Sequence, residues 1–130
     1  MYSSDLQKWI DEAVKYLKSS WGLDASFAGQ VALLFLYFHH YGLSPVITSG
    51  WRSPEKQAEL LSRYNAGDRS VLAKPAIRSK HLDTNWLGQP AAHAVDISTN
   101  NPQMAANIAQ ALGIGAGYFF SSPDPVHYQT

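Results

Sequence analysis

The sequence predicts an α+β fold in which a small antiparallel sheet packs against helices. Two stretches with apolar residues at helical spacing fill the first third of the chain, at about 4–42. Short β-branched and apolar runs, bounded by turn residues, follow within about 46–128. The chain of 130 residues is expected to form a single domain, 1–130, that buries about two-thirds of its unfolded surface.

Two helices are expected before the first strand. The first covers about 4–20, with Ser4 or Asp5 as its N-cap. The second covers about 24–42, and its run 31–38 is apolar on most sides. This second helix is therefore the best candidate for the centre of the core.

A strand-to-helix junction is expected in the middle of the chain. The β-branched run 45–48 predicts a short strand, and Ser53 and Pro54 supply an N-cap and an N1 proline for a helix through Tyr64. Arg52 therefore lies between the strand and the helix.

The second half is predicted to begin with a long surface excursion over 65–90, because turn formers are frequent there and no periodicity appears. This excursion carries Ser79 and His81. The elements expected after it are a strand, a helix and two further strands: 93–98, 101–112, 116–120 and 126–129.

Composition excludes several classes of function. With no cysteine, thiolate zinc sites and cysteine nucleophiles are impossible, so any metal must be held by His, Asp or Glu. Ten basic and ten acidic residues argue against a nucleic-acid partner that needs a broad positive surface. The longest apolar run, Val31–Phe38, is far shorter than the roughly 20 residues of a membrane span, so a soluble protein is expected.

The usual catalytic signatures are missing as well. The sequence has no H-E-x-x-H, no G-x-S-x-G and no G-x-x-x-x-G-K-[ST] motif. The glycines at 113, 115 and 117 follow a helix instead of opening one, which argues against a nucleotide cradle.

Four polar motifs occur in a defined order along the chain: Thr48–Ser53 followed by Gln57, Ser79-x-His81, Ala94–Ile97, and Asp124-x-x-His127. In this order they resemble the zinc D-Ala-D-Ala carboxypeptidase and peptidoglycan endopeptidase family. That family includes the VanX and VanY type enzymes and several phage endolysins, and it shares a fold with the Hedgehog signalling domain. The resemblance spans about 46–128.

The resemblance implies the ligands of one zinc ion: His81, Asp96 and His127. Two imidazoles and one carboxylate leave the fourth corner of the zinc tetrahedron for water, as in catalytic sites. Asp124 would be the general base, and Arg52 would hold the substrate or its oxyanion. Gln57 and Ser79 match positions that line the substrate cleft in the family.

The spacing of the first ligand departs from the family pattern. In S-x-H-x-x-G-x-A-x-D the histidine lies seven positions before the aspartate, whereas here the separation between His81 and Asp96 is fifteen. Residues 83–90 form the apparent insertion, and Ala92 replaces the motif glycine. His93 is the competing ligand, but on a continuous strand it would face away from Asp96, so His81 is preferred unless a bulge intervenes.

The insertion also carries Trp86. One interpretation is that this ring lines the cleft or closes over the substrate. The other is that it anchors a tolerated surface loop to the body of the protein.

Each site residue also has a purely structural interpretation. Asp96 and Asp124 are typical of turns, Arg52 of a helix-flanking charge, and His127 of a core imidazole. The occurrence of four motifs in order favours the zinc site. The remaining pair, His39 and His40, is interpreted as structural, near the C-terminus of a helix.

The function that the resemblance implies is zinc-dependent hydrolysis of a peptidoglycan stem-peptide or crosslink bond beside a D-amino acid, as an endopeptidase or a carboxypeptidase. The alternatives are an inactive, zinc-stabilised module that binds cell wall or protein, and a metal-free interaction domain. No signal peptide is visible. Action in the periplasm or cell wall would need holin release, a dedicated secretion system or a larger exported protein. A monomer is expected, with an immunity protein as partner if the chain is an antibacterial effector.

Overall fold

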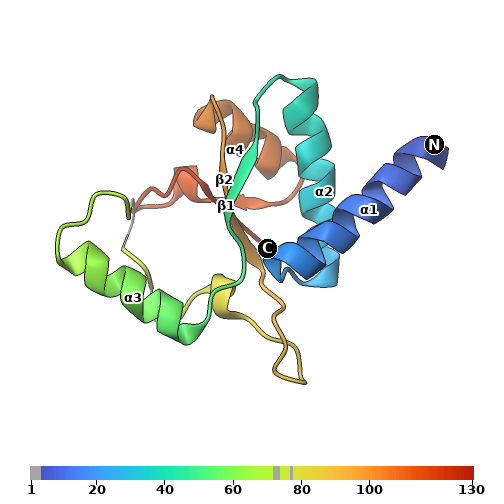
Figure 1. Cartoon of the computed structure of the whole chain (residues 1–130). Coiled ribbons are helices and arrows are strands. Elements are labelled where there is room, and N and C mark those ends of the chain that lie inside the picture. The colour runs from blue at the N-terminus through green and yellow to red at the C-terminus, as the bar shows by residue number, and fades with distance from the viewer. Residues whose placement is uncertain (1–3, 72–73, 77) are drawn as a thin grey trace.

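A four-stranded antiparallel sheet forms the centre of the structure, with the strand order β1-β2-β4-β3 (Figure 1). The computed structural model describes residues 4–71, 74–76 and 78–130. Within these residues the strands are β1 Val46–Ser49, β2 Ala94–Ser98, β3 Gly115–Ala116 and β4 His127–Gln129. The predicted α+β class is confirmed.

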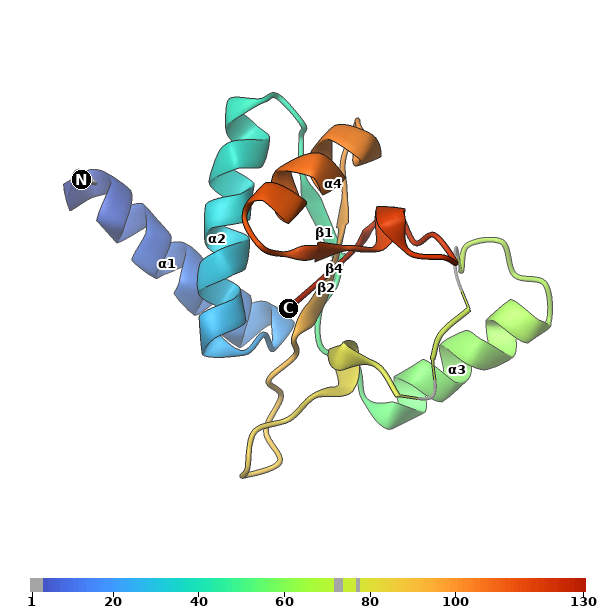
Figure 2. The same cartoon turned by 180° about the vertical axis from the view of Figure 1, so that it is seen from behind.

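The α-helices of the described residues are α1 Ser4–Trp21, α2 Ala25–His40, α3 Pro54–Asn65 and α4 Pro102–Ala111. Figure 1 and Figure 2 show α2 and α4 together beside the sheet, with α1 against α2, while α3 stands apart from these three. As expected, α2 supplies much of the core, and Asp24 caps it by accepting a hydrogen bond from the Phe27 amide. None of the described helices combines the length and apolar character that a membrane crossing requires.

Strand alternation gives the sheet two different faces. Val95 and Ile97 of β2 and Tyr128 of β4 belong to the hydrophobic core that packs on the helices. Because successive side chains of a strand point to opposite faces, Asp96 and His127 lie on the other face. One face of β2 and β4 is therefore apolar, and the other carries polar groups.

The insertion between the third helix and β2 folds back on itself as a hairpin, residues 83–91. Its arms are joined by a bridge between Thr84 and Pro90 and by a hydrogen bond of 2.9 Å from the Ala91 amide to the Asp83 carbonyl. A short 3₁₀-helix, η1 (Lys80–Leu82), precedes it. The excursion expected over 65–90 thus contains a 3₁₀-helix and most of a hairpin, and residues 72, 73 and 77 of it lie outside the described residues.

The strand predicted over 116–120 is wrong. β3 has only two residues, and a 3₁₀-helix, η2 (Gly117–Phe119), follows it. The reason is a close return of the chain, because the Asp124 amide donates to the Gly117 carbonyl at 2.9 Å. A Cβ atom at Gly117 would lie 2.3 Å from the Asp124 carbonyl oxygen, so glycine permits this approach.

Candidate metal and catalytic site

Asp96 and His127 are brought together by strand pairing. The two residues are direct cross-strand partners in the antiparallel pair of β2 and β4. Their side chains share the polar face of the sheet, and directly opposed residues are close enough to interact. The core residues Val95 and Tyr128, paired beside them, fix this register through the hydrophobic face.

His81 reaches the same place from η1. Ser79 caps this 3₁₀-helix, since its hydroxyl accepts a hydrogen bond from the His81 amide at 3.2 Å. The His81 carbonyl accepts from the Arg52 amide at 2.8 Å, and the ring is 2.8 Å from the Gly50 carbonyl. These contacts tie η1 to the end of β1, and only 2% of His81 is exposed.

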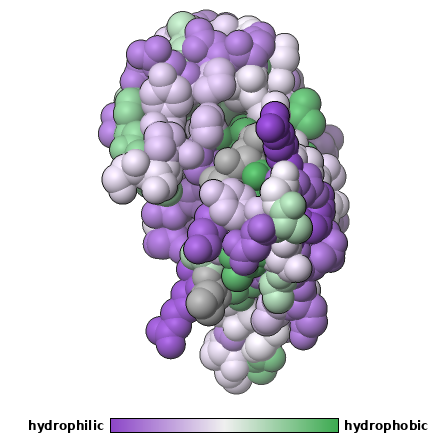
Figure 3. All heavy atoms as spheres, turned by 90° about the vertical axis from the view of Figure 1, so that its left-hand side faces the viewer, coloured by the Kyte–Doolittle hydropathy of each residue, from purple (hydrophilic) through white to green (hydrophobic). Residues whose placement is uncertain are grey.

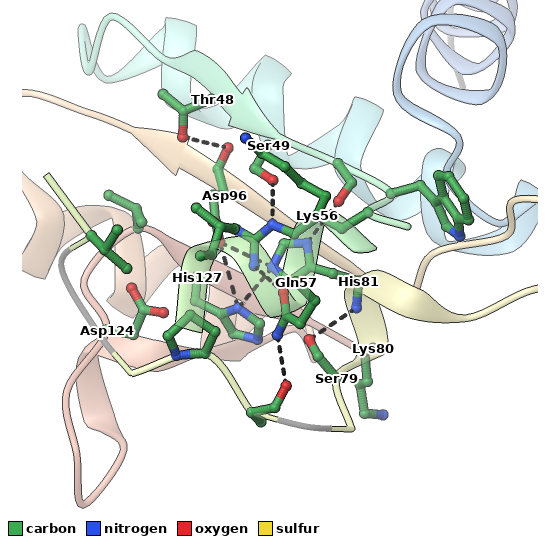
Figure 4. A pocket seen from close by; sticks show the side chains of 18 of the residues that line it. Thr48, Ser49, Lys56, Gln57, Ser79, Lys80, His81, Asp96, Asp124 and His127 are labelled. Carbon is green, nitrogen blue, oxygen red and sulfur yellow. Dashed lines mark hydrogen bonds and ion pairs between the residues drawn. The ribbon is translucent and has the colours of Figure 1, made fainter. Parts of the chain in front are cut away.

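Three potential ligand atoms converge in this arrangement (Figure 4). The His81 Nε2 atom lies 3.2 Å from Asp96 Oδ1 and 3.3 Å from His127 Nδ1. The His127 Nδ1 atom lies 3.5 Å from Asp96 Oδ1. In a tetrahedral zinc site with ligand distances of about 2.0–2.2 Å, neighbouring ligand atoms are separated by about 3.3–3.6 Å. The three distances therefore fit one face of a zinc tetrahedron.

The hydrogen-bond partners of the outer ring nitrogens determine where the lone pairs of the inner nitrogens lie. The ring nitrogens that face outward contact oxygen acceptors: His81 Nδ1 contacts the Gly50 carbonyl, and His127 Nε2 contacts Gln129 Oε1 at 2.8 Å. An N–H at each outer nitrogen leaves a lone pair on the inner one. Asp96 Oδ1 is buried and accepts no hydrogen bond. Three acceptor atoms thus face one another, which is the environment of a bound cation.

The electrostatics of the site also favour positive charge. Burial alone would raise the pKa of Asp96, but the neighbouring His127, His81 and Arg52 side chains outweigh it and hold the pKa below its usual range. Burial alone would lower the pKa of His127, but Asp96, Gln129 and Asp124 outweigh it and raise the pKa. The carboxylate is thus held ionised next to a ring that attracts a positive charge.

Arg52 binds the oxygen of Asp96 that does not face the two histidines. Its Nη2 atom lies 2.6 Å from Asp96 Oδ2, its Nε donates to Ser49 Oγ at 2.9 Å, and its Nη1 donates to Gln57 Oε1 at 3.2 Å. These bonds use three of the five N–H donors of a guanidinium. The structure thus places Arg52 where it orients the Asp96 carboxylate, and two of its donors are not used by these bonds.

Replacing Arg52 with lysine is expected to lower zinc affinity by about 10–100-fold, a typical effect of losing a group that orients a ligand. One ammonium cannot reproduce three bonds in a planar fork, so the Asp96 carboxylate would lose its fixed orientation. Competition with a chromogenic chelator measures the affinity. The matched control is Arg63→Lys, which alters a partly exposed ion pair with Asp68 at 2.8 Å. Unchanged zinc affinity with reduced hydrolysis would instead support the substrate-binding role predicted from the sequence.

Asp124 lies beside the three residues, in the turn before β4. It lines the same cleft, as Figure 4 shows, and its backbone carbonyl accepts from the His127 amide at 3.1 Å. Burial raises the pKa of Asp124, the negative charge of Asp96 raises it further, and the neighbouring His127 and His81 side chains partly offset this. A carboxylate with a raised pKa is a stronger proton acceptor, which suits acid–base chemistry.

The cleft around these residues is large, with a volume of about 1720 Å³. Its lining includes residues of α3, residues 74–76 and 78–81, the segments 19–22 and 48–52, and residues between 120 and 129. Pockets for small molecules usually have about 300–1,000 Å³, so this cleft suits a longer ligand such as a peptide.

The three other residues predicted to contact substrate, Gln57, Ser79 and Trp86, lie in different environments. Gln57 is buried, and besides contacting Arg52 it donates from Nε2 to the Ala76 carbonyl at 2.7 Å. Ser79 acts as the cap of η1. Trp86 is 91% exposed on the hairpin and is not among the cleft-lining residues, so a contact with substrate would require a substrate that extends beyond the cleft.

His93 lies outside the group of three. Its Nδ1 atom is 2.8 Å from Asp83 Oδ2, and its Nε2 atom is 3.7 Å from Asp24 Oδ2. It lies just before β2, on the side of the α2 N-terminus, where Asp24 is the N-cap. It therefore links the hairpin to α2, whereas the metal-binding geometry is found at His81.

Two supporting groups were missed by the sequence analysis: the Gly50 carbonyl and the Gln129 amide. Gln129 lies two positions after His127 on one strand, so period-two alternation could have placed it on the same face. The Gly50 contact joins residues 31 positions apart, and no local pattern indicates it.

Replacing Gly50 with alanine is expected to reduce thermal stability and to lower zinc affinity by about 10–100-fold. The new Cβ would lie 2.3 Å from the Trp21 carbonyl oxygen, so the chain must shift, and the carbonyl that orients His81 would move with it. Thermal unfolding with and without zinc measures both effects. Gly29→Ala in α2 is the control, because its Cβ would meet nothing within 4 Å. Equal zinc affinity in both variants would contradict the role of the Gly50 carbonyl.

Comparison with known proteins adds a fold relationship. No protein-family model matches the chain, and no curated protein matches its sequence significantly. Among solved structures, the chain is similar to the Serratia marcescens L-Ala D-Glu endopeptidase ChiX, with a TM-score of 0.56 and 19% sequence identity. The match covers 93% of this chain and 85% of that chain. At this identity the similarity shows a shared fold.

Proposed function

We propose that this chain is a zinc-dependent peptidase that hydrolyses a stem-peptide or crosslink bond beside a D-amino acid in bacterial peptidoglycan. The observation that carries the proposal is the convergence of His81, Asp96 and His127 at the separations of tetrahedral zinc ligands. The shared fold with an L-Ala D-Glu endopeptidase supports the choice of substrate. The proposed place of action is the bacterial cell wall.

His81 Nε2, His127 Nδ1 and Asp96 Oδ1 would hold the ion. A zinc ion bound there would lower the pKa of its bound water and polarise the carbonyl group of the substrate. The Asp124 carboxylate then takes the proton of the attacking water and returns it to the leaving nitrogen of the cleaved amide. Arg52 keeps the Asp96 carboxylate in position during these steps through its bond to Oδ2.

The proposal is tested by measuring zinc content and peptidoglycan cleavage in the same preparation. We expect about one zinc per chain by elemental analysis, as one tetrahedral site requires. Mass spectrometry of the released fragments should show cleavage beside a D-residue. A protein that retains zinc and leaves every fragment intact would contradict the peptidase and favour a zinc-stabilised binding module.

A further inference from the structure

The charges of this chain are unevenly distributed although their formal sum is zero. Six of the ten Lys and Arg residues line the cleft, but only two of the ten Asp and Glu residues do, and these two are Asp96 and Asp124. Figure 3 shows the side of the molecule on which α3 and the following loop lie, and hydrophilic side chains occupy much of it. The cleft is therefore the basic region of a neutral protein.

Most of these cations already have partners. The pairs are Arg52 with Asp96, Lys56 with Glu59, Arg63 with Asp68, and Lys80 with the Thr130 carbonyl. Within the described residues, Lys74 and Arg78 are the cleft cations for which no hydrogen bond or ion pair is found. Both are exposed. They are therefore available to a ligand.

Two residues near these cations, Ala76 and Ser79, are tied to the proposed metal site. The Ala76 carbonyl accepts a hydrogen bond from Gln57, whose side chain also contacts Arg52. Ser79, next to Arg78, caps the 3₁₀-helix that holds His81. Anchors on both sides of Arg78 thus limit where its guanidinium can reach, and they connect it to the groups that hold the ligands.

We propose that Lys74 and Arg78 form a carboxylate-binding subsite that selects peptides with an acidic residue beside the cleaved bond. This inference rests on the proposed function and specifies its substrate. Guanidinium and ammonium groups bind carboxylates through charge-assisted hydrogen bonds, with Arg able to bind in bidentate fashion. Two uncompensated cations match one or two carboxylates, whereas a nucleic acid needs a longer basic stripe to neutralise many phosphates.

The test uses two peptides that differ only in D-glutamate or D-glutamine beside the cleaved bond. The Lys74→Gln/Arg78→Gln double variant is expected to raise KM for the acidic peptide about tenfold, the loss typical of one or two charge-assisted hydrogen bonds, and to remove the preference over the amidated peptide. The control is Arg69→Gln, an exposed arginine of the same loop that does not line the cleft. A preference that survives in the double variant would overturn the subsite.

Direct binding separates this inference from the proposed function. Calorimetry of the same two peptides with the double variant and with Arg69→Gln reports carboxylate recognition whether or not hydrolysis occurs. Preference for the acidic peptide without hydrolysis would support the subsite and contradict the peptidase. Hydrolysis without any preference would contradict only the subsite. Tighter binding of a single-stranded oligonucleotide than of the acidic peptide would also overturn the proposal.

Discussion

Replacing His81 with alanine is expected to lower zinc affinity by more than about 100-fold, beyond the loss expected for a group that only orients a ligand. The substitution removes one of three converging ligand atoms and leaves Asp96 and His127 as an incomplete set. The native protein should lose thermal stability when a chelator removes zinc, because a metal that binds only the folded state stabilises it. The variant should show no response to chelator, which differential scanning calorimetry measures.

The matched control is His93→Ala, because His93 is the other histidine considered for the first ligand. This change removes contacts with Asp83 and Asp24 but leaves all three converging atoms in place. It is expected to lower stability modestly and to retain zinc. If His93→Ala loses zinc and His81→Ala keeps it, the ligand assignment across the insertion is wrong.

Replacing Asp124 with asparagine is expected to reduce kcat by about 10²–10⁴-fold while zinc content stays the same. Asparagine has nearly the same shape as aspartate, but its amide cannot take a proton from water. Steady-state kinetics on a defined stem peptide, together with elemental analysis, separates chemistry from metal binding. The large effect is expected because Asp124 and Asp96 are the only carboxylates that line the cleft among the described residues, and Asp96 is proposed to bind the metal.

The control for this variant is Glu59→Gln, which also removes one carboxylate but lies outside the cleft lining and pairs with Lys56. It should retain nearly full activity. Two outcomes would contradict the role of Asp124: retained activity, which would require another base, or loss of zinc along with activity, which would indicate a structural role.

Strand alternation explains which parts of the site could be predicted from the sequence. Val95, Asp96 and Ile97 read as a buried strand with one polar position, and Val126 to Gln129 as a second strand with His127 within it. Period-two geometry is local, so the pattern of apolar residues indicates which face each side chain takes. The resemblance added the expectation that Asp96 and His127 lie close together, and the pairing of β2 with β4 places them opposite each other.

The parts that could not be predicted depend on contacts distant in sequence. A guanidinium in a strand-to-helix junction gives no sign that it will contact Ser49, Gln57 and Asp96 together, since these bonds exist only after the sheet forms. A contact between residues that are not adjacent in sequence also explains why the strand predicted over 116–120 does not form. Its aromatic residues, Tyr118, Phe119 and Phe120, have high β-propensity, but the return of Asp124 onto Gly117 overrides that preference.

The hairpin 83–91 makes the positions of the three converging side chains independent of the length of chain between His81 and Asp96. The Asp83 carbonyl accepts from the Ala91 amide at 2.9 Å, and the His93 amide donates to the Lys80 carbonyl at 3.0 Å, so the chain leaves and returns at nearly the same point. Loop closure entropy grows slowly with length, by about 0.6 kcal/mol per doubling. The exposed tip around Trp86 is therefore a natural graft point, where a fluorescent tag or an affinity peptide could be inserted while His81 and Asp96 keep their positions.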